Sequence, residues 1–215
     1  AKTLAEVLED VENLPQHEKI YLKDGSVHYQ IAQKIRRGQK LCNVRGGTSS
    51  VHTWDIPEVF GHTTDHEKEI LKKTMRLRRT ERLRKVGDAD PVALKSLNRE
   101  MGMDVHNDIL SLIRKGYIRT VGDRFDLVNT FNGKYRRLDW NSASPTVDTR
   151  FGGARYFLHP SENRSFTVRE AARIQGFPDW FKFPGKSTDS FKMIGNAVPP
   201  PMAKHIASLI QNIID

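Results

Sequence analysis

Few side chains in this 215-residue sequence are suited to covalent chemistry. The one cysteine, Cys42, follows a leucine in what we expect to be a basic, glycine-flanked loop, and a single thiol cannot form an internal disulfide. His62 and His66 have the spacing of metal ligands on one helix face, but no thiol or clear carboxylate set accompanies them. We therefore expect surface histidines and no metal. Gly185-Lys186-Ser187 lacks an upstream glycine-rich phosphate loop, so it predicts a turn.

Positive charge is concentrated in two segments. The chain carries a net charge of +9, and residues 71–85 hold eight basic side chains against Glu81 alone, while residues 114–137 hold seven against two. A local basic excess indicates nucleic-acid binding, because each neutralised phosphate releases counterions. A solvated basic helix face would have the same composition, so that alternative stays open. Arg78 and Arg79 are the candidates for phosphate contact in the first segment.

The overall composition excludes several classes of protein. An apolar share of 37% with 28% charged residues is not that of a disordered or collagenous chain. No run approaches the roughly 18 apolar residues of a membrane helix, and residues 1–12 are acidic, unlike a signal peptide. We expect a chain that is cytoplasmic, is nucleoid-associated when bound to DNA, and has no membrane partner.

The first 64 residues predict a loop-rich lead into the next segment. Leu4, Val7 and Leu8 share one face of a short helix, which Asn13-Leu14-Pro15 ends. Periodicity is poor between residues 21 and 60, where we expect irregular structure that lies on a neighbour.

Residues 65–133 predict three helices followed by a hairpin. The first helix is expected over residues 65–85. Asp90-Pro91 predicts the cap and first turn of the second helix, which Gly102 ends.

The third helix and the hairpin complete this module. Apolar residues recur at helical spacing between Asp104, the expected cap, and Gly116, and alternating strands flank Gly122-Asp123. This order is that of a winged helix, in which the third helix would enter the major groove. Asn107 and Asp108 on its outer face read DNA less readily than arginine would, so the alternative of a packing role stays open.

The C-terminal segment, residues 161–215, begins with a helix whose two ends are specified by the sequence. Thr167 and Glu170 form a capping box, Gly176 ends the helix, and Pro178 prevents its continuation. Residues 195–201 then predict a rigid turn that opens a last helix. An apolar stripe of five residues on that helix must be buried against something: Ile206, Leu209, Ile210, Ile213 and Ile214.

These motifs resemble those of the DNA (cytosine-5) methyltransferases. Residues 164–179 are similar to the ninth conserved motif of that family, and residues 194–200 to the tenth. His159-Pro160, Thr146-Val147 and Gly152-Gly153 resemble the end of its target recognition region. Residues 3–15 resemble the stretch after its eighth motif, whereas a middle of about 110 residues matches poorly.

Three features of the family are missing from the sequence. Its nucleophile is a cysteine after proline, which Cys42 is not, and neither its Phe-x-Gly-x-Gly turn nor its Gln-x-Arg-x-Arg strand occurs. The resemblance therefore implies the C-terminal half of such an enzyme, as a subunit or an excised fragment. This half would be inactive alone, and its C-terminal helices would dock on a separate Rossmann-like catalytic domain.

The resemblance also implies roles for individual residues. Asn196, Ala197 and Val198 would line the site of S-adenosylmethionine once the catalytic half is present; the alternative for Asn196 is a turn residue with positive φ. Arg169 and Arg173, in the same motif as Thr167 and Glu170, would be ion-paired scaffolding between the recognition and catalytic domains, or else contact DNA. Thr146 would touch the backbone beside the extruded nucleotide. The expected contacts with double-stranded DNA are Arg78, Arg79, Arg136, Arg137, Thr146, Arg150, Gly152, Gly153 and Arg155.

The predicted fold class is α+β, with four parts. These are the lead (1–64), the winged-helix-like module (65–133), small irregular β recognition loops (134–160) and the C-terminal motifs with the docking helix (161–215). The predicted function is target recognition and cofactor closure in a sequence-specific DNA cytosine methyltransferase of restriction-modification type. The alternatives are a free-standing winged-helix DNA-binding regulator and a degenerate partner protein with no DNA role.

Overall fold

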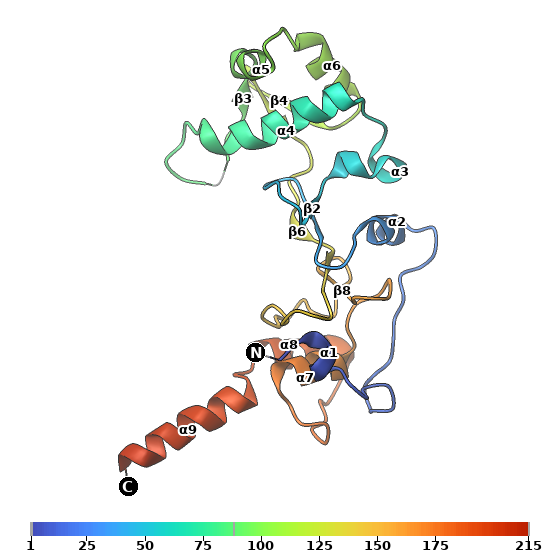
Figure 1. The fold of residues 1–215 in the computed structure, drawn as a ribbon, viewed down its shortest axis with the longest axis vertical. Coiled ribbons are helices and arrows are strands. Elements are labelled where there is room, and N and C mark those ends of the chain that lie inside the picture. Colours follow the sequence, from blue (N-terminus) through green and yellow to red (C-terminus); the bar gives the residue numbers. More distant parts are fainter. Residues whose placement is uncertain (1, 88, 215) are drawn as a thin grey trace. The chain divides into compact units, whose positions relative to one another are not determined.

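The computed structural model describes residues 2–87 and 89–214 as a mixed α+β chain with small sheets. It contains two compact units, traced in Figure 1: unit 1 joins residues 1–39 to residues 134–215, and unit 2 is residues 40–133. The predicted lead of 64 residues is therefore divided between the two units. Within the described residues, no helix is long and apolar enough to cross a membrane.

Three helices and a three-stranded antiparallel sheet form the main core of unit 2. The helices are α4 (Asp65–Thr80), α5 (Leu94–Met101) and α6 (His106–Arg114), and the sheet order is β3 (Val92–Ala93), β5 (Arg124–Leu127), β4 (Ile118–Val121). The predicted hairpin is confirmed, since β4 and β5 pair on either side of Gly122-Asp123. The core between helices and sheet is apolar and fully buried, as at Ile70, Leu71, Leu97, Ile109 and Leu112.

Helix ends in unit 2 agree with the sequence at two glycines, whereas the predicted cap at Asp104 is wrong because Val105 is the N-cap of α6. Gly102 ends α5 in the left-handed conformation, and Gly116 follows α6 with φ 77°. The Asp104 carboxylate accepts the backbone N–H of His106, although the helix begins one residue later than a cap at Asp104 would place it.

Asp90 is not the cap of the second helix, contrary to prediction. The carboxylate of Asp90 accepts the backbone N–H groups of Leu83 and Arg84, each at 2.8 Å, and pairs with the Arg84 guanidinium. These hydrogen bonds lower the pKa of Asp90 to about 2. They fold the chain back after α4, which explains why α4 ends at Thr80 rather than near residue 85, and why α5 begins only at Leu94.

The rest of unit 2 is a small sheet with short helical turns. β1 (Lys40–Cys42) lies between β2 (Ser50–Val51) and β6 (Asn132–Lys134), and a 3₁₀ turn (Thr53–Asp55) leads into α3 (Pro57–Phe60). The expected loop at Cys42 is wrong, because this residue ends a strand and its thiol is buried. Burial of Leu41 and Cys42 in the central strand of this sheet outweighs the glycine signal that follows.

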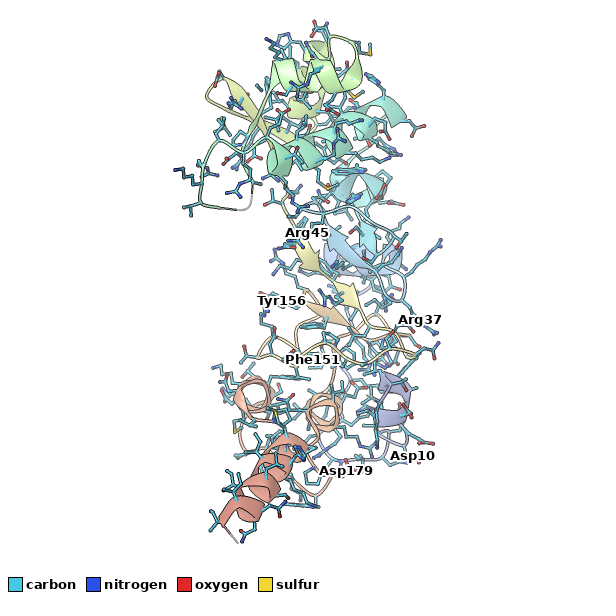
Figure 2. All side chains as sticks on the ribbon, turned by 60° about the vertical axis from the view of Figure 1, so that its left-hand side comes forward. Asp10, Arg37, Arg45, Phe151, Tyr156 and Asp179 are labelled. Atoms are coloured by element: carbon cyan, nitrogen blue, oxygen red, sulfur yellow. The ribbon has the colours of Figure 1, made fainter. Side chains whose placement is uncertain are left out.

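Unit 1 packs short elements around an aromatic core. In chain order these are α1 (Leu4–Val7), α2 (Val27–Lys34), β7 (Arg136–Arg137), β8 (Phe157–Leu158), α7 (Val168–Gln175), α8 (Ser187–Asn196) and α9 (Pro200–Ile214). Phe151, labelled in Figure 2, is fully buried against Phe157 and Phe166. Leu4 and Leu8 contribute to this core, as their shared helical face predicted.

The expectation of irregular structure over residues 21–60 is wrong at α2. The Ser26 hydroxyl accepts the backbone N–H of Tyr29 to cap this helix, and Ile31 and Ala32 bury its inner face. Two buried positions in eight residues give too short a periodic pattern to identify a helix from sequence.

The last helix of unit 1 is unlike the others. None of the described side chains of α9 is buried, and the predicted apolar stripe is open: Ile206 is 42% exposed, Leu209 50% and Ile213 83%. By contrast, α7 buries six of its eight residues. An apolar helix of 15 residues with no covered face is one side of an incomplete packing contact.

Candidate functional site

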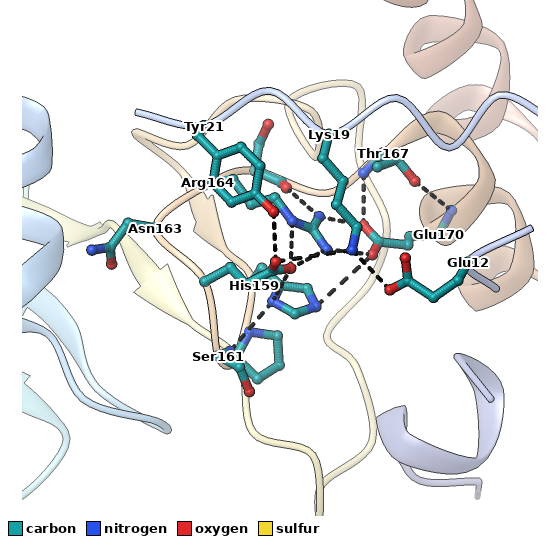
Figure 3. Close-up of polar contacts among 12 residues, drawn as sticks. Glu12, Lys19, Tyr21, His159, Ser161, Asn163, Arg164, Thr167 and Glu170 are labelled. Carbon is teal, nitrogen blue, oxygen red and sulfur yellow. Dashed lines mark hydrogen bonds and ion pairs between the residues drawn. The ribbon is translucent and has the colours of Figure 1, made fainter. Parts of the chain in front are cut away.

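A buried ion pair organises the segment that contains the capping box. Both terminal nitrogens of Arg164 donate to the two carboxylate oxygens of Glu170 at 2.8 Å, and each side chain is 1% exposed. Glu170 also accepts the backbone N–H of Thr167, whose hydroxyl caps α7 in return. The predicted capping box is thus confirmed, and one carboxylate serves both the cap and the ion pair (Figure 3).

The pKa of Glu170 reflects these contacts. Burial acts to raise the pKa of Glu170, but the hydrogen bonds and charge of Arg164 outweigh it, so the pKa lies below its usual value. Figure 3 also shows Lys19 and Tyr21 beside this pair, and the Tyr21 hydroxyl donates to Glu162 at 2.7 Å. The N-terminal segment is therefore attached to the same cluster.

His159 lies against the same ion pair as a neutral ring. Burial, followed by the positive charge of Arg164, lowers the pKa of His159 to about 4. The Glu170 carboxylate lies 3.8 Å from Nε2, but its charge is largely neutralised by Arg164, so burial dominates. His159 packs edge-on to Trp140 as part of the core rather than as an open catalytic base.

Arg169 and Arg173 contact protein groups within unit 1. The buried guanidinium of Arg169 donates to the carbonyl oxygens of Pro15 and Phe181 at 3.1 and 2.9 Å. Arg173 forms a two-pronged pair with Asp179 and also donates to the carbonyl of Glu9. The arrangement is that of scaffolding that joins the N-terminal segment to the loop after α7.

The predicted DNA contact Arg137 is buried in this structure. Arg137 is 7% exposed, and its guanidinium donates to four backbone carbonyls and to the oxygen of one side-chain amide. Burial lowers the pKa of Arg137, and none of these acceptors is a carboxylate. Arg136, next in the chain, is half-buried. The acceptors of Arg137 are Ala32, Ile35, His159 and Glu162 through their carbonyls, and Asn163 through its side chain.

The predicted recognition residues 146–155 form a loop held against α8. A Cβ on Gly152 would lie 2.2 Å from the Phe191 ring, and one on Gly195 would lie 2.3 Å from the backbone nitrogen of Thr149. Both glycines are thus required by close approach within the chain. Arg150 and Arg155 are exposed at the outer face of the loop, and Arg150 pairs with Asp148 at 2.5 Å.

Thr146 and Gly153 border two different cavities of unit 1. Exposed Thr146 lines a groove of about 930 Å³ that also touches α1, Gly176 and Pro201. Gly152 and Gly153 line a second cavity of about 640 Å³ with Tyr156 and Phe191. The groove brings the predicted recognition loop and the two C-terminal motifs to one surface.

Residues 196–198 comprise the last residue of α8 and the start of the turn to α9, and a side chain of α7 is hydrogen-bonded to this turn. The buried Gln175 amide donates to the carbonyls of Ile194 and Ala197, the latter at 2.9 Å. Asn196 is the last residue of α8 and does not have a positive φ, so the alternative of a positive-φ turn residue is wrong. Asn196 and Val198 are exposed, which leaves an amide and an apolar side chain available as one wall of a site.

The two predicted phosphate contacts in unit 2 differ in burial. Arg78 is 7% exposed and its guanidinium contacts Asp126 at 2.5 Å, whereas Arg79 is exposed. On α6, Asn107 is exposed, and Asp108 lies 3.6 Å from the His66 ring. In residues 2–87 and 89–214, no cluster of three His, Cys, Asp or Glu side chains is placed to hold a metal ion.

Sequence reasoning missed the positions that hold unit 1 together. Arg164 and Gln175 donate buried hydrogen bonds, and His159 is buried beside the Arg164–Glu170 pair. In the sequence these residues were identified only as members of a motif, without a packing role. One signal was present: a capping-box glutamate that is also buried needs a cation, and Arg164 lies six residues earlier.

Comparison with known proteins gives the family. Residues 6–212 match the family model of the C-5 cytosine-specific DNA methylases. The chain is 29% identical over 194 residues to DNA (cytosine-5)-methyltransferase 3 of Arabidopsis thaliana, covering 86% of this chain and 14% of that protein. It is 30% identical over 172 residues to the type II methyltransferase M.HgiCI of Herpetosiphon aurantiacus, covering 79% of this chain and 40% of that protein.

A third relative matches a shorter stretch more strongly. The type II methyltransferase M.AgeI of Thalassovita gelatinovora is 45% identical over 82 residues, which are 38% of this chain and 19% of that protein. The chain therefore belongs to the C-5 cytosine-specific DNA methylase family, whose methyl donor is S-adenosylmethionine. It spans less than half the length of each of these three relatives.

Proposed function

We propose that this chain is the target-recognition and cofactor-closing half of a DNA (cytosine-5) methyltransferase. It acts with a catalytic portion that carries the Pro-Cys nucleophile and most of the S-adenosylmethionine site, and it is inactive without that portion. The resulting enzyme methylates cytosine in a specific duplex DNA sequence. Family membership and the absence of a Pro-Cys pair in this sequence support the proposal.

The open apolar face of α9 is the observation that carries the proposal. Five residues at helical spacing each expose between 42% and 83% of their surface, on a helix whose start is already fixed to α7 through Gly176 and Pro201. Exposure of such a face to water is unfavourable, since burial of apolar surface contributes roughly 25 cal/mol of stabilising free energy per Å². A catalytic portion with a matching apolar surface is the occupant we propose.

Closure of the methyl-donor site falls to residues 196–198. S-adenosylmethionine supplies the methyl group when it is bound. Gln175 holds the backbone of Ala197, so the Asn196 amide and the Val198 side chain face outward from a fixed turn. In this proposal they form one wall of a site whose other walls belong to the catalytic portion.

DNA recognition falls to the winged-helix-like module and the loops after it. Helices α4, α5 and α6 followed by the β4–β5 hairpin have the element order of that module. In unit 1, exposed Arg150 and Arg155, half-buried Arg136 and the backbone at Gly152-Gly153 are the groups proposed to meet the duplex. Arg137 supports them from beneath, since its donors are already used.

Complementation of methyl transfer tests the proposal. The chain is mixed with a polypeptide that carries the family's cofactor-binding and Pro-Cys motifs, and transfer of labelled methyl groups to duplex DNA is measured. Neither component should be active alone, and the mixture should be. With Asn196→Ala, the apparent affinity for S-adenosylmethionine should fall while DNA binding is retained. Failure of the unaltered chain with every family partner tried would contradict the proposal.

A further inference from the structure

Three arginines of unit 2 line one small pocket. This arginine pocket consists of Arg45, Arg79 and Arg82 with Val44 and Asn132, and its volume is about 190 Å³. Figure 2 labels Arg45. The residues come from three places in the chain, so their convergence is a property of the fold and not of one basic run.

Secondary structure fixes the walls of the arginine pocket. Val44 and Arg45 directly follow β1, and Asn132 begins β6, which lies beside β1 in the sheet. Arg79 belongs to the last turn of α4, and the Arg82 guanidinium donates to the carbonyl of Arg84 at 3.1 Å. That contact uses one terminal nitrogen of Arg82, and none of the carboxylates that the structure describes pairs with this guanidinium.

Three described carboxylates near this end of α4 are paired with other arginines. Glu81 pairs with Arg99, Asp90 pairs with Arg84, and Asp126 pairs with both Arg78 and Arg119. Within the described part of the chain, no ion pair involves Arg45, Arg79 or Arg82. Three like charges are thus brought together, and none of them is paired with a carboxylate of residues 2–87 or 89–214.

We infer that the arginine pocket binds a single phosphate group of the DNA backbone. Guanidinium groups donate in a planar fork that matches phosphate oxygens, and the Asn132 amide at the same pocket offers a further donor. The volume is below the roughly 300–1,000 Å³ of sites for small organic ligands, which favours an ion-sized group. A duplex phosphate carries no sequence information, so the pocket would set affinity and register.

This inference rests on the proposed function, because it takes duplex DNA as the ligand. The test is the salt dependence of duplex binding by the full chain, with Arg45, Arg79 and Arg82 all changed to Gln. One neutralised phosphate contributes about 0.9 to the slope of log affinity against log salt. The triple variant should therefore lose about 0.9 of slope and bind about tenfold to a hundredfold more weakly.

Two further variants separate a phosphate pocket from simple loss of charge. A control with Arg36, Lys95 and Lys182 changed to Gln removes three exposed charges elsewhere and should leave the slope unchanged. Arg45, Arg79 and Arg82 all changed to Lys keeps the charge but not the fork, so the slope should stay while affinity falls several-fold. Urea unfolding of each variant should match that of the unaltered chain.

Several results would overturn the inference. An unchanged slope in the Gln variant would do so, as would a loss near 2.7, which indicates three independent surface contacts. Inorganic phosphate tested against chloride at equal ionic strength should compete only weakly with DNA. Tight binding of inorganic phosphate with unaltered DNA binding in the Gln variant would assign the pocket to a free anion instead. Failure of complementation by the unaltered chain would contradict the proposed function separately.

Discussion

Arginine is used in two opposite ways in this chain, and each unit provides a clear set of examples. In unit 1, Arg137, Arg164 and Arg169 are buried, and backbone carbonyls or a carboxylate accept their hydrogen bonds. In unit 2, Arg79 is exposed and lines a pocket with Arg45 and Arg82, and within the described residues no ion pair involves these three arginines. The difference shows that acceptors supplied by the fold, and not the density of basic residues, decide whether an arginine is structural or available.

Burial explains why Arg137, Arg164 and Arg169 need hydrogen-bond acceptors from the protein. A charge removed from water is costly unless its donors are satisfied, and Arg137 finds five acceptors at 2.7–2.9 Å. Those acceptors come from the end of α2 with the residue after it, and from the loop that follows β8, so one side chain joins distant parts of unit 1. A DNA contact by Arg137 would require breaking these bonds.

The largest expected loss of stability comes from breaking the buried Arg164–Glu170 ion pair. Arg164→Met leaves the Glu170 carboxylate buried with one partner removed, so unfolding free energy should fall by about 3–5 kcal/mol. Urea unfolding followed by circular dichroism measures it. The matched control Arg150→Met removes an exposed pair and should cost less than about 1 kcal/mol. Equal losses in the two variants would break the contrast between buried and exposed arginines.

A pair of adjacent residues sharpens the comparison within unit 2. Arg78→Met removes one of two cations from buried Asp126, and because Arg119 stays in contact the expected loss is about 2–3 kcal/mol. Arg79→Met should change stability by less than about 0.5 kcal/mol yet weaken duplex binding. The same unfolding assay and a duplex-binding titration check both. Loss of stability at Arg79 would place it with the structural arginines.

A smaller effect is expected from pH at His159. Its pKa is about 4 in the folded chain, so below its usual value near 6.5 the unfolded chain takes up a proton that the folded chain does not. The free energy of unfolding should therefore fall by about 2 kcal/mol as the pH is lowered from about 6.5 to about 4.5. Glu170, with its lowered pKa, adds to the loss only below about pH 4.5.

Unfolding measured across that pH range tests the assignment to His159. His159→Gln removes the titrating group, so its stability should be nearly flat between about pH 6.5 and 4.5. A loss of the same size in the variant would mean that another group is responsible.

Local signals made parts of the fold predictable. The Thr167–Glu170 capping box, the glycine stops at Gly102 and Gly176, and the Gly122-Asp123 hairpin are each determined by two to four neighbouring residues. Gly176 has φ 88°, a conformation that favours glycine whatever surrounds it.

Features that depend on distant partners were not predictable. Asp90 was expected to cap a helix that follows it, but it folds back to accept N–H groups from Leu83 and Arg84. Arg78 and Arg79 look equivalent in the sequence, yet only Arg78 faces Asp126, 48 residues away. The arginine pocket likewise depends on the pairing of β1 with β6, which no local pattern encodes.

Hydrogen exchange of α9 tests the central claim most directly. In the chain alone, the amides of residues 202–214 should exchange rapidly, because the helix has no buried side chain among those described. Adding the catalytic portion should slow them by at least about tenfold, and Leu209→Glu with Ile210→Glu should abolish both this protection and methyl transfer without changing the stability of the chain. Rapid exchange of α9 in a mixture that is active, or full activity of the double variant, would contradict the account.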